Sequence, residues 1–272
     1  MPTLAGVGHA EVKRYLSLRG GRGGSSGRVA LDGLWSLRRA RESDLPLEVA
    51  FRCPEMSRGP EGAALFTQLE TEGIRCYEIS PRLAERMADR DGPDGIFAIG
   101  CLRDWRFDDL AAEAPALLMV LDRLESAGNT GTMIRLADAV GAAVIACDSR
   151  VRLEHPKVLH ASMATLLHVP VVRASGDETR GWLRQNGFQV VLADPECPVG
   201  YRDASYKQKV AVVVGSERYG LTGGWPASAD LAVSLPMRGR ADSLNVGQAA
   251  AVILYEVLAA QSAVEGGKGS GP

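Results

Sequence analysis

Three short segments of this 272-residue chain place glycine, amide, carboxylate and arginine side chains where an apolar strand gives way to a turn. In the first segment, Asn129 and Gly131 lie in a turn, and Arg135 follows four residues later, near the first turn of an expected helix. A helix N-terminus favours anions, and an arginine adds a forked donor that suits phosphate. The segment predicts a phosphate contact, and the alternative is an arginine that caps or pairs within its own helix.

The second segment is an apolar run that leads directly into Gly215 and then Glu217. The carboxyl ends of strands in an α/β sheet face the ligand crevice, and glycine lets a ligand approach the backbone closely. The segment therefore predicts a ligand-facing loop with a carboxylate beside it. The alternative is a tight turn that carries an exposed glutamate.

The third segment begins where an apolar strand ends at Leu235, and it continues through a short loop into a hydrophobic helix. Ser243 and Asn245 stand just before that helix. Their hydroxyl and amide groups suit a ligand site, but either residue could equally be the N-cap of the helix. Taken alone, each of the three segments is compatible with an ordinary turn or cap.

Several common signatures are absent from the sequence. No G-x-G-x-x-G follows a strand, and Gly215–Gly220 has phosphate-loop spacing without the lysine of a Walker A motif. No histidine pair has metal-ligand spacing, so His155, His160 and His168 are expected to be packing or surface residues. Five scattered cysteines without a C-x-x-C pair favour free thiols in a reducing cytoplasm over a disulfide or zinc framework.

Bulk composition is that of an ordinary globular protein, with 46% hydrophobic residues, 24% charged residues and a net charge of -2. No apolar run is long enough to span a membrane, and no secretory signal is recognised, so a cytoplasmic protein is expected. Basic residues gather in positions 1–41, where eight of them stand against two acidic ones. A basic end can follow an RNA phosphate backbone, and the alternative is a solvated helix face. The candidate RNA contacts there are Arg14, Arg19, Arg22 and Arg28.

Alternating apolar strands and amphipathic helices predict an α/β fold in two domains. We expect a domain over 1–104, a linker over 105–115, a second domain over 116–262 and a disordered tail over 263–272. Near-continuous apolar runs in the second domain predict a parallel sheet covered on both faces. Its expected strands cover 116–121, 142–147, 169–172, 189–193, 210–214 and 231–235, and its expected helices cover 130–140, 179–186 and 245–260.

In their order along the chain, the three segments resemble the SpoU/TrmH branch of the SPOUT RNA methyltransferases over 116–260. The family pattern is N-x-G-x-x-x-R, then G-x-E-x-x-G-L, then a strand ending in I/L-P-M and an S-L-N-V run. The matching positions are Asn129 to Arg135, Gly215 to Leu221, Leu235-Pro236-Met237 and Ser243-Leu244-Asn245-Val246. The chain departs from the family at Ala127, where proline is common, and at Ala164-Thr165, where Gly-Ala is usual.

The first domain is similar to the L30e-like RNA-binding domain that is often fused to this family. The matching stretches are 28–35, which resembles a strand into an x-E-G turn, and 94–98, which resembles x-Q-G-I-x-A. The chain has Asp32 where glutamate is usual and Asp94 where glutamine is usual. These departures concern substrate positioning more than catalysis.

The resemblance implies properties that spacing and composition do not show. Chains in general avoid threading, so the residues alone predict an ordinary doubly wound sheet, whereas the family has a deep trefoil knot that forms its cofactor pocket. The family is also homodimeric. The implied reaction moves a methyl group from S-adenosylmethionine to a ribose 2'-hydroxyl, without a metal.

The same resemblance assigns roles to residues. Backbone around Leu192, Gly215, Leu235, Met237 and Leu244, together with Ser243, would hold S-adenosylmethionine. Asn129, Glu217, Ser243 and Asn245 would complete the active site. Arg135 matches the catalytic arginine of the family; because a guanidinium with a pKa above about 12 is a poor base, we expect it to hold the adjacent phosphate and polarise the 2'-hydroxyl.

The expected substrate is structured RNA, and the L30e-like domain favours 23S rRNA over tRNA. The resemblance includes housekeeping enzymes and enzymes that confer thiostrepton resistance, so both roles stay open. Two further alternatives are a non-catalytic RNA-binding protein that retains the fold and a methyltransferase for a small molecule. The basic first domain argues against a small substrate, which would not need an RNA platform.

Overall fold

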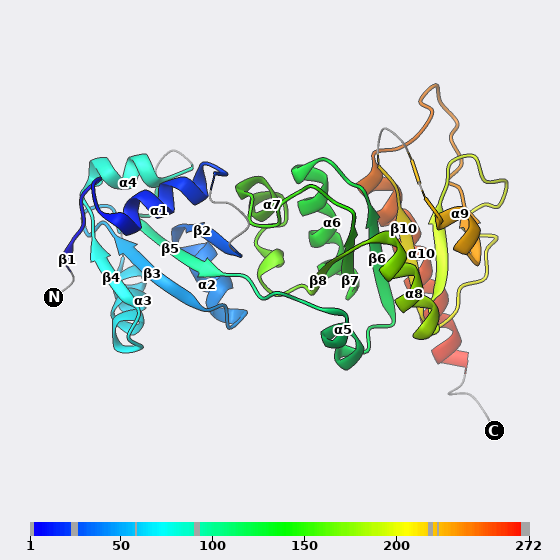
Figure 1. The fold of residues 1–272 in the computed structure, drawn as a ribbon, viewed down its shortest axis with the longest axis horizontal. Helices are drawn as coiled ribbons and strands as arrows, with labels where there is room; N and C mark the ends of the chain where they lie inside the picture. Colours follow the sequence, from blue (N-terminus) through cyan, green and yellow to red (C-terminus); the bar gives the residue numbers. More distant parts are fainter. Residues whose placement is uncertain are drawn as a thin grey trace. The chain divides into compact units, whose positions relative to one another are not determined.

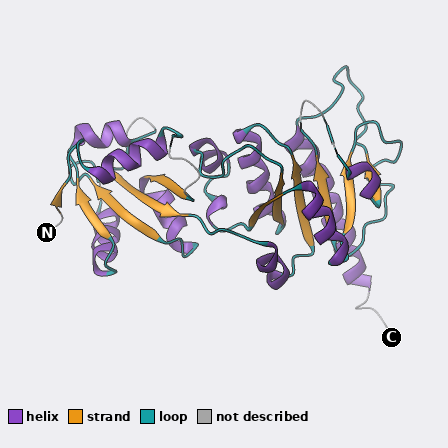
Figure 2. Cartoon of the chain, in the orientation of Figure 1, coloured by secondary structure: helices purple, strands orange, loops and turns teal. Residues whose placement is uncertain are grey.

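The structure is a computed structural model that describes residues 3–22, 27–57, 59–89, 93–216, 220–221 and 223–267, the last five by backbone alone. The chain divides into two compact units. The first unit comprises Met1–Asp104 with Arg152–His160, and the second comprises Trp105–Val151 with Ala161–Pro272. Figures 1 and 2 show that each unit is built of a sheet with helices packed on it.

The first unit contains a five-stranded mixed sheet in the order β1-β4-β3-β5-β2. Strands β1, β4 and β3 run parallel to one another, whereas β5 is antiparallel to both β3 and β2. Its elements are β1 (Thr3–Leu4), α1 (Ala10–Arg19), β2 (Arg28–Asp32), α2 (Gly33–Glu42), β3 (Leu47–Arg52), α3 (Pro60–Thr71), β4 (Arg75–Glu78), α4 (Pro81–Met87) and β5 (Ile96–Cys101).

Helical spacing explains how α1 covers this sheet. Val12, Tyr15 and Leu18 recur every three residues and are buried, so one stripe of the helix faces the core. The Tyr15 ring meets Phe51 and Phe97 edge-on at centroid distances of 5.9 Å and 5.7 Å. Its hydroxyl donates to the backbone carbonyl of Leu31 at 3.2 Å, which satisfies a polar group at full burial.

The second unit contains a six-stranded sheet in the order β11-β9-β10-β6-β7-β8, and all of its pairings are parallel. The predicted α/β class and parallel sheet are therefore confirmed, and the trefoil knot stays a prediction. Its elements are α5 (Phe107–Glu113), β6 (Leu117–Asp122), α6 (Ala127–Val140), β7 (Ala143–Cys147), η1 (Thr165–Leu167), β8 (Val171–Ala174), α8 (Gly176–Gln185), β9 (Gln189–Ala193), β10 (Val210–Val214), α9 (Trp225–Ser228), β11 (Leu231–Val233) and α10 (Val246–Gly267).

Helices cover both faces of this parallel sheet. Leu110 of α5, Leu183 of α8 and Trp225 of α9 share one core cluster with inward side chains of the strands. Successive strand residues point to opposite faces, so the other face is left for α6 and α10. These two helices approach closely, because a Cβ on Gly247 of α10 would lie 3.3 Å from the Thr132 side chain of α6.

The structure differs from the sequence prediction at three places. The expected linker 105–115 contains α5, whose Leu110 is fully buried in the core of the second unit. A single buried leucine gives no periodic signal, which is why the segment reads as polar. The last helix continues to Gly267 rather than ending near position 260. Residues 152–160, within the sequence expected for the second domain, belong to the first unit, and this range includes most of α7 (Pro156–Ala161).

Candidate active site

The carboxyl ends of neighbouring strands bring the three segments to one edge of the second unit's sheet. Leu121 of β6 pairs with Val214 of β10, and Leu192 of β9 pairs with Val213. The residues that follow β6, β9, β10 and β11 therefore emerge at the same edge. In an open parallel sheet this edge is where ligands bind.

Gly215 starts a tightly closed loop at this edge. The backbone of Ser216 donates to Gly220 at 3.1 Å, and Gly220 donates back to Ser216 at 2.8 Å. A Cβ at position 215 would overlap the Gly220 carbonyl group and the Leu221 backbone nitrogen, so only glycine fits there. Glu217 lies outside the described residues, and its role in the site stays a prediction.

The first segment forms the start of α6 rather than a turn before it. The Ser126 hydroxyl caps the helix by accepting the backbone N–H of Asn129 at 3.2 Å. Asn129 is thus in the first turn, and Arg135 lies in the third turn. The expectation that Arg135 stands near the helix N-terminus is wrong, because the cap at Ser126 starts the helix earlier than 130. The dipole effect fades within one turn, so Arg135 must act through its own charge.

Arg135 is exposed on α6. No hydrogen bond or ion pair engages its guanidinium within the part of the chain that the structure describes. The alternative reading, in which this arginine caps or pairs within its own helix, therefore has no support among those residues. An exposed cation without a protein partner is suited to a phosphate of a bound substrate.

The third segment meets the first through the packing of α10 on α6. The Asn245 side-chain oxygen accepts the backbone N–H of Gly247 at 2.9 Å, and its carbonyl accepts that of Ala249 at 3.0 Å. Asn245 therefore acts as an N-terminal cap of α10, the alternative that the sequence left open. Gly247 lies against Thr132, which places Asn245 beside the helix that carries Asn129 and Arg135.

The remaining residues predicted to bind the cofactor differ in how exposed their side chains are. The Leu192 side chain is only 3% exposed and belongs to the core, so only its backbone could reach a ligand. Leu235 is half-buried after β11, and Ser243 is exposed. Met237 and Leu244 are exposed apolar side chains on the loop between β11 and α10. Exposed apolar groups beside polar loop atoms suit a ligand with an aromatic ring and a polar tail.

Three of the four arginines expected to contact RNA have acidic partners in the first unit. Arg14 pairs with Glu11 at 3.0 Å and with Glu48, Arg28 pairs with Glu48 at 2.8 Å, and Arg19 pairs with Asp89 at 2.8 Å. Arg22 is exposed. These pairs reduce the local positive charge that the sequence suggested, and the four RNA contacts stay predictions.

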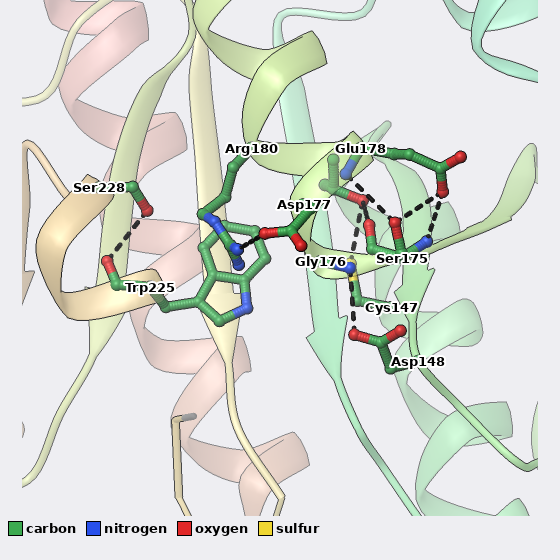
Figure 3. Close-up of polar contacts among 10 residues, drawn as sticks. Cys147, Asp148, Ser175, Gly176, Asp177, Glu178, Arg180, Trp225 and Ser228 are labelled. Atoms are coloured by element: carbon green, nitrogen blue, oxygen red, sulfur yellow. Dashed lines mark hydrogen bonds and ion pairs between the residues drawn. The ribbon is translucent and has the colours of Figure 1, made fainter. Parts of the chain in front are cut away.

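A cavity of about 770 Å³ lies at the same edge of the sheet, and no pattern in the sequence predicted it. It lies beyond the ends of β6, β7 and β8, and Arg180 of α8 and Trp225 of α9 help to line it. Figure 3 shows these side chains facing one another from two different helices. Neither residue belongs to the three segments, and only the fold brings them together.

These features define an α/β enzyme domain with its site at the carboxyl edge of a parallel sheet. The family model described as the SpoU rRNA Methylase family matches residues 116–255, and the chain belongs to that family. The chain is therefore an RNA methyltransferase, which confirms both the resemblance and the predicted activity.

Two curated relatives are each 31% identical to this chain. One is the 23S rRNA (guanosine(2553)-2'-O)-methyltransferase RlmP of Bacillus subtilis, which matches over 70% of this chain and 75% of its own length. The other is the 23S rRNA (uridine(2479)-2'-O)-methyltransferase of Streptomyces viridochromogenes, which matches over 71% of this chain and 69% of its own length.

Solved structures agree on the fold. A crystal structure of an RNA 2'-O ribose methyltransferase is 29% identical, covers 96% of this chain and 100% of its own, and has a TM-score of 0.75. An AdoMet-bound rRNA methyltransferase from Sinorhizobium meliloti is 23% identical, covers 94% of this chain and 96% of its own, and has a TM-score of 0.82. The second likeness concerns the fold alone.

Proposed function

We propose that this protein transfers a methyl group from S-adenosylmethionine to a ribose 2'-hydroxyl of 23S rRNA. The observation that carries the proposal is the meeting of the Gly215 loop, the start of α6 and the cap of α10 at one edge of the sheet. The named activities of the two curated relatives support the choice of 23S rRNA.

The residues present fit this cofactor. Met237 and Leu244 offer exposed apolar surface to an adenine ring, and Ser243 offers a hydroxyl. Gly215 keeps the loop backbone closed without a side chain in the way. Leu192 and Leu235 would contribute backbone groups. S-adenosylmethionine, when bound, supplies a methyl group on an activated sulfonium.

The work left to the protein is alignment of the 2'-hydroxyl and removal of its proton. The exposed guanidinium of Arg135 holds the phosphate next to the target ribose and polarises the hydroxyl. As the new O–CH₃ bond forms and the S–CH₃ bond breaks, the hydroxyl proton passes to that phosphate or to water. Asn129, Glu217 and Asn245 complete the polar surroundings of the ribose.

The same proposal covers the RNA-binding unit, the oligomeric state and the location of the protein. The first unit acts as the RNA platform, and the exposed Arg22 is one of its cations. Val252 and Tyr255 are exposed on α10, 39% and 54% respectively, and a second copy of the chain would cover them in a homodimer. The described residues include no helix long and apolar enough to cross a membrane. A cytoplasmic location is proposed, since ribosomal RNA is found there.

The test maps ribose methylation on 23S rRNA and on tRNA after incubation with the protein and the cofactor. Arg135→Ala should retain cofactor binding by calorimetry and lose transfer by about 100-fold or more, as for removal of a single charge-stabilising donor. Arg184→Ala, at another exposed arginine, is the matched control. Methylation of tRNA alone would overturn the proposal that 23S rRNA is the substrate. Full activity of Arg135→Ala would overturn the role proposed for Arg135.

A further inference from the structure

The cavity of about 770 Å³ beyond β6, β7 and β8 is large enough for a small ligand or for one nucleoside. Its described lining includes Ser216 at the start of the Gly215 loop but no residue of β9, of β11 or of the loop that follows β11. It is therefore a separate space from the proposed cofactor residues, although it opens at the same edge of the sheet.

A row of backbone hydrogen bonds builds the floor of this cavity. Arg123, after β6, donates to the last residue of β7 at 3.0 Å, and Asp148, after β7, donates to the last residue of β8 at 3.0 Å. Both residues have left-handed backbones, with φ of 54° and 48°. Asp148 then accepts the backbone N–H of Gly176, the first residue of α8, at 3.1 Å. The carboxylate is thus held at a fixed place in the cavity wall.

Trp225 supplies a buried donor that has no partner among the described residues. Its side chain is fully buried, and its indole Nε1 makes no hydrogen bond within the part of the chain that the structure describes. That nitrogen lies 3.8 Å from the position that a Cβ on Gly176 would take, and the Asp148 carboxylate lies 3.3 Å from the same position (Figure 3). A buried N–H without an acceptor is unfavourable. A bound group that accepts this hydrogen bond next to Asp148 would therefore be stabilised.

Arg180 forms a flat wall of the same cavity. Its guanidinium lies over the Trp225 ring at 5.3 Å, and a Cβ on either Gly176 or Gly224 would lie 3.0 Å from it. Its ion pair with Asp177 is weak, because the Asp177 side chain is 92% exposed. The two glycines therefore let the guanidinium pack closely against their backbone and the Trp225 ring, and the Arg180 side chain is only 17% exposed.

The charges of the lining decide the class of ligand. Four acidic side chains and three arginines line the cavity among the described residues, so an isolated phosphate would meet more negative than positive charge. An uncharged group with acceptors and N–H donors on one edge fits the exposed Asp148 side chain and the Trp225 indole together. RNA-binding proteins read unpaired bases in this way, by hydrogen bonds to the edges of the bases.

We propose that this cavity binds one unpaired nucleobase of the RNA substrate, whose acceptor receives the Trp225 N–H and whose N–H donors pair with Asp148. The proposal rests on the proposed function, since it assumes an RNA substrate. It assigns to Asp148, Arg180 and Trp225 a role in choosing the RNA rather than in methyl transfer.

Tryptophan indole resonances test this directly. The chain has four tryptophans, and the Trp225→Phe spectrum identifies the Trp225 signal in the ¹⁵N-labelled protein. We expect at least one of adenosine, guanosine, cytidine and uridine, at millimolar concentration, to shift the Trp225 signal and to leave that of exposed Trp35 in place. Inorganic phosphate should shift neither. An equal shift with phosphate, or none with any nucleoside, overturns the proposal.

A substitution test separates this site from the chemistry. Asp148→Asn keeps an acceptor for the Gly176 N–H but removes the carboxylate charge. We expect KM for RNA to rise about 5- to 30-fold, with kcat and cofactor affinity within two-fold of wild type. The control is Asp108→Asn, at an exposed position of α5. An unchanged KM in an enzyme that methylates RNA overturns the inference alone. Nucleoside shifts in a protein that methylates no RNA overturn the proposed function alone.

Discussion

The closed loop at Gly215 makes a quantitative prediction about cofactor binding. Gly215→Ala would place a methyl group on the Gly220 carbonyl and the Leu221 nitrogen. Because that contact is with backbone, the new side chain cannot rotate away, and the loop must open. Opening breaks the two hydrogen bonds between Ser216 and Gly220, at 3.1 Å and 2.8 Å.

Each backbone hydrogen bond contributes about 0.5–1.5 kcal/mol net, so opening this loop costs about 1–3 kcal/mol. If the bound cofactor requires the closed loop, this cost appears as an affinity about 5- to 150-fold lower. The lost hydrogen bonds also lower the free energy of unfolding by up to the same amount, so the melting temperature should fall by a few degrees while the buried strand Val210–Val214 stays folded.

The assay is titration calorimetry with S-adenosylmethionine on Gly215→Ala, with thermal unfolding measured in parallel. Gly181→Ala is the matched control, because Gly181 lies inside α8 with no atom within 4 Å of its added Cβ. We expect that control to bind normally and to gain up to about 1 kcal/mol of stability. Wild-type affinity in Gly215→Ala would refute the link between the closed loop and the cofactor.

Two further predictions separate structural from chemical roles. Asn245→Asp should leave the free energy of unfolding within about 0.5 kcal/mol of wild type, because asparagine and aspartate cap helices equally well. It should lower methyl transfer at least ten-fold, because the amide donors are lost. Normal transfer would show that Asn245 only caps α10. The hydrogen bond that His160 donates to the Asp89 carboxylate raises the pKa of His160, so this pair should stabilise the fold below pH 6.5 and lose its effect as pH rises through the raised pKa. The free energy of unfolding of His160→Gln in urea should therefore differ from that of wild type more at pH 5.5 than at pH 8.5. The change should be under about 1 kcal/mol, because the pair is exposed. An equal difference at both pH values would contradict the assignment.

The sheet of the second unit was predictable because its strands are almost wholly buried. Val210–Val214 is an unbroken apolar run, and the structure places a strand over the predicted residues. The start of α6 was predicted three residues late, because the cap depends on a single hydrogen bond from Asn129 to Ser126. Periodicity identifies the buried face of a helix, but it does not identify the residue at which the helix begins.

The cavity residues could not be predicted for a different reason. Trp225 lies in the four-residue helix α9, which is too short to show a period, and it meets Arg180 across more than forty positions of sequence. The close packing of that arginine depends on Gly176 and Gly224, each of which reads as a turn residue. One sequence, without its fold, does not connect these four positions.

In the three segments, a structural role and a role in ligand binding do not exclude each other. Ser126 caps α6, Asn245 caps α10, and Gly215 starts a closed turn, so local structure accounts for part of each segment, although Arg135 has no capping or pairing role among the described residues. Those same local bonds fix where Asn129 and the exposed loop atoms stand at the edge of the sheet. A residue that anchors the backbone beside a ligand serves both purposes at once. At the capping residues Ser126 and Asn245, loss of activity after alanine substitution therefore does not assign a role by itself, and substitutions that keep the cap while changing the functional group are needed.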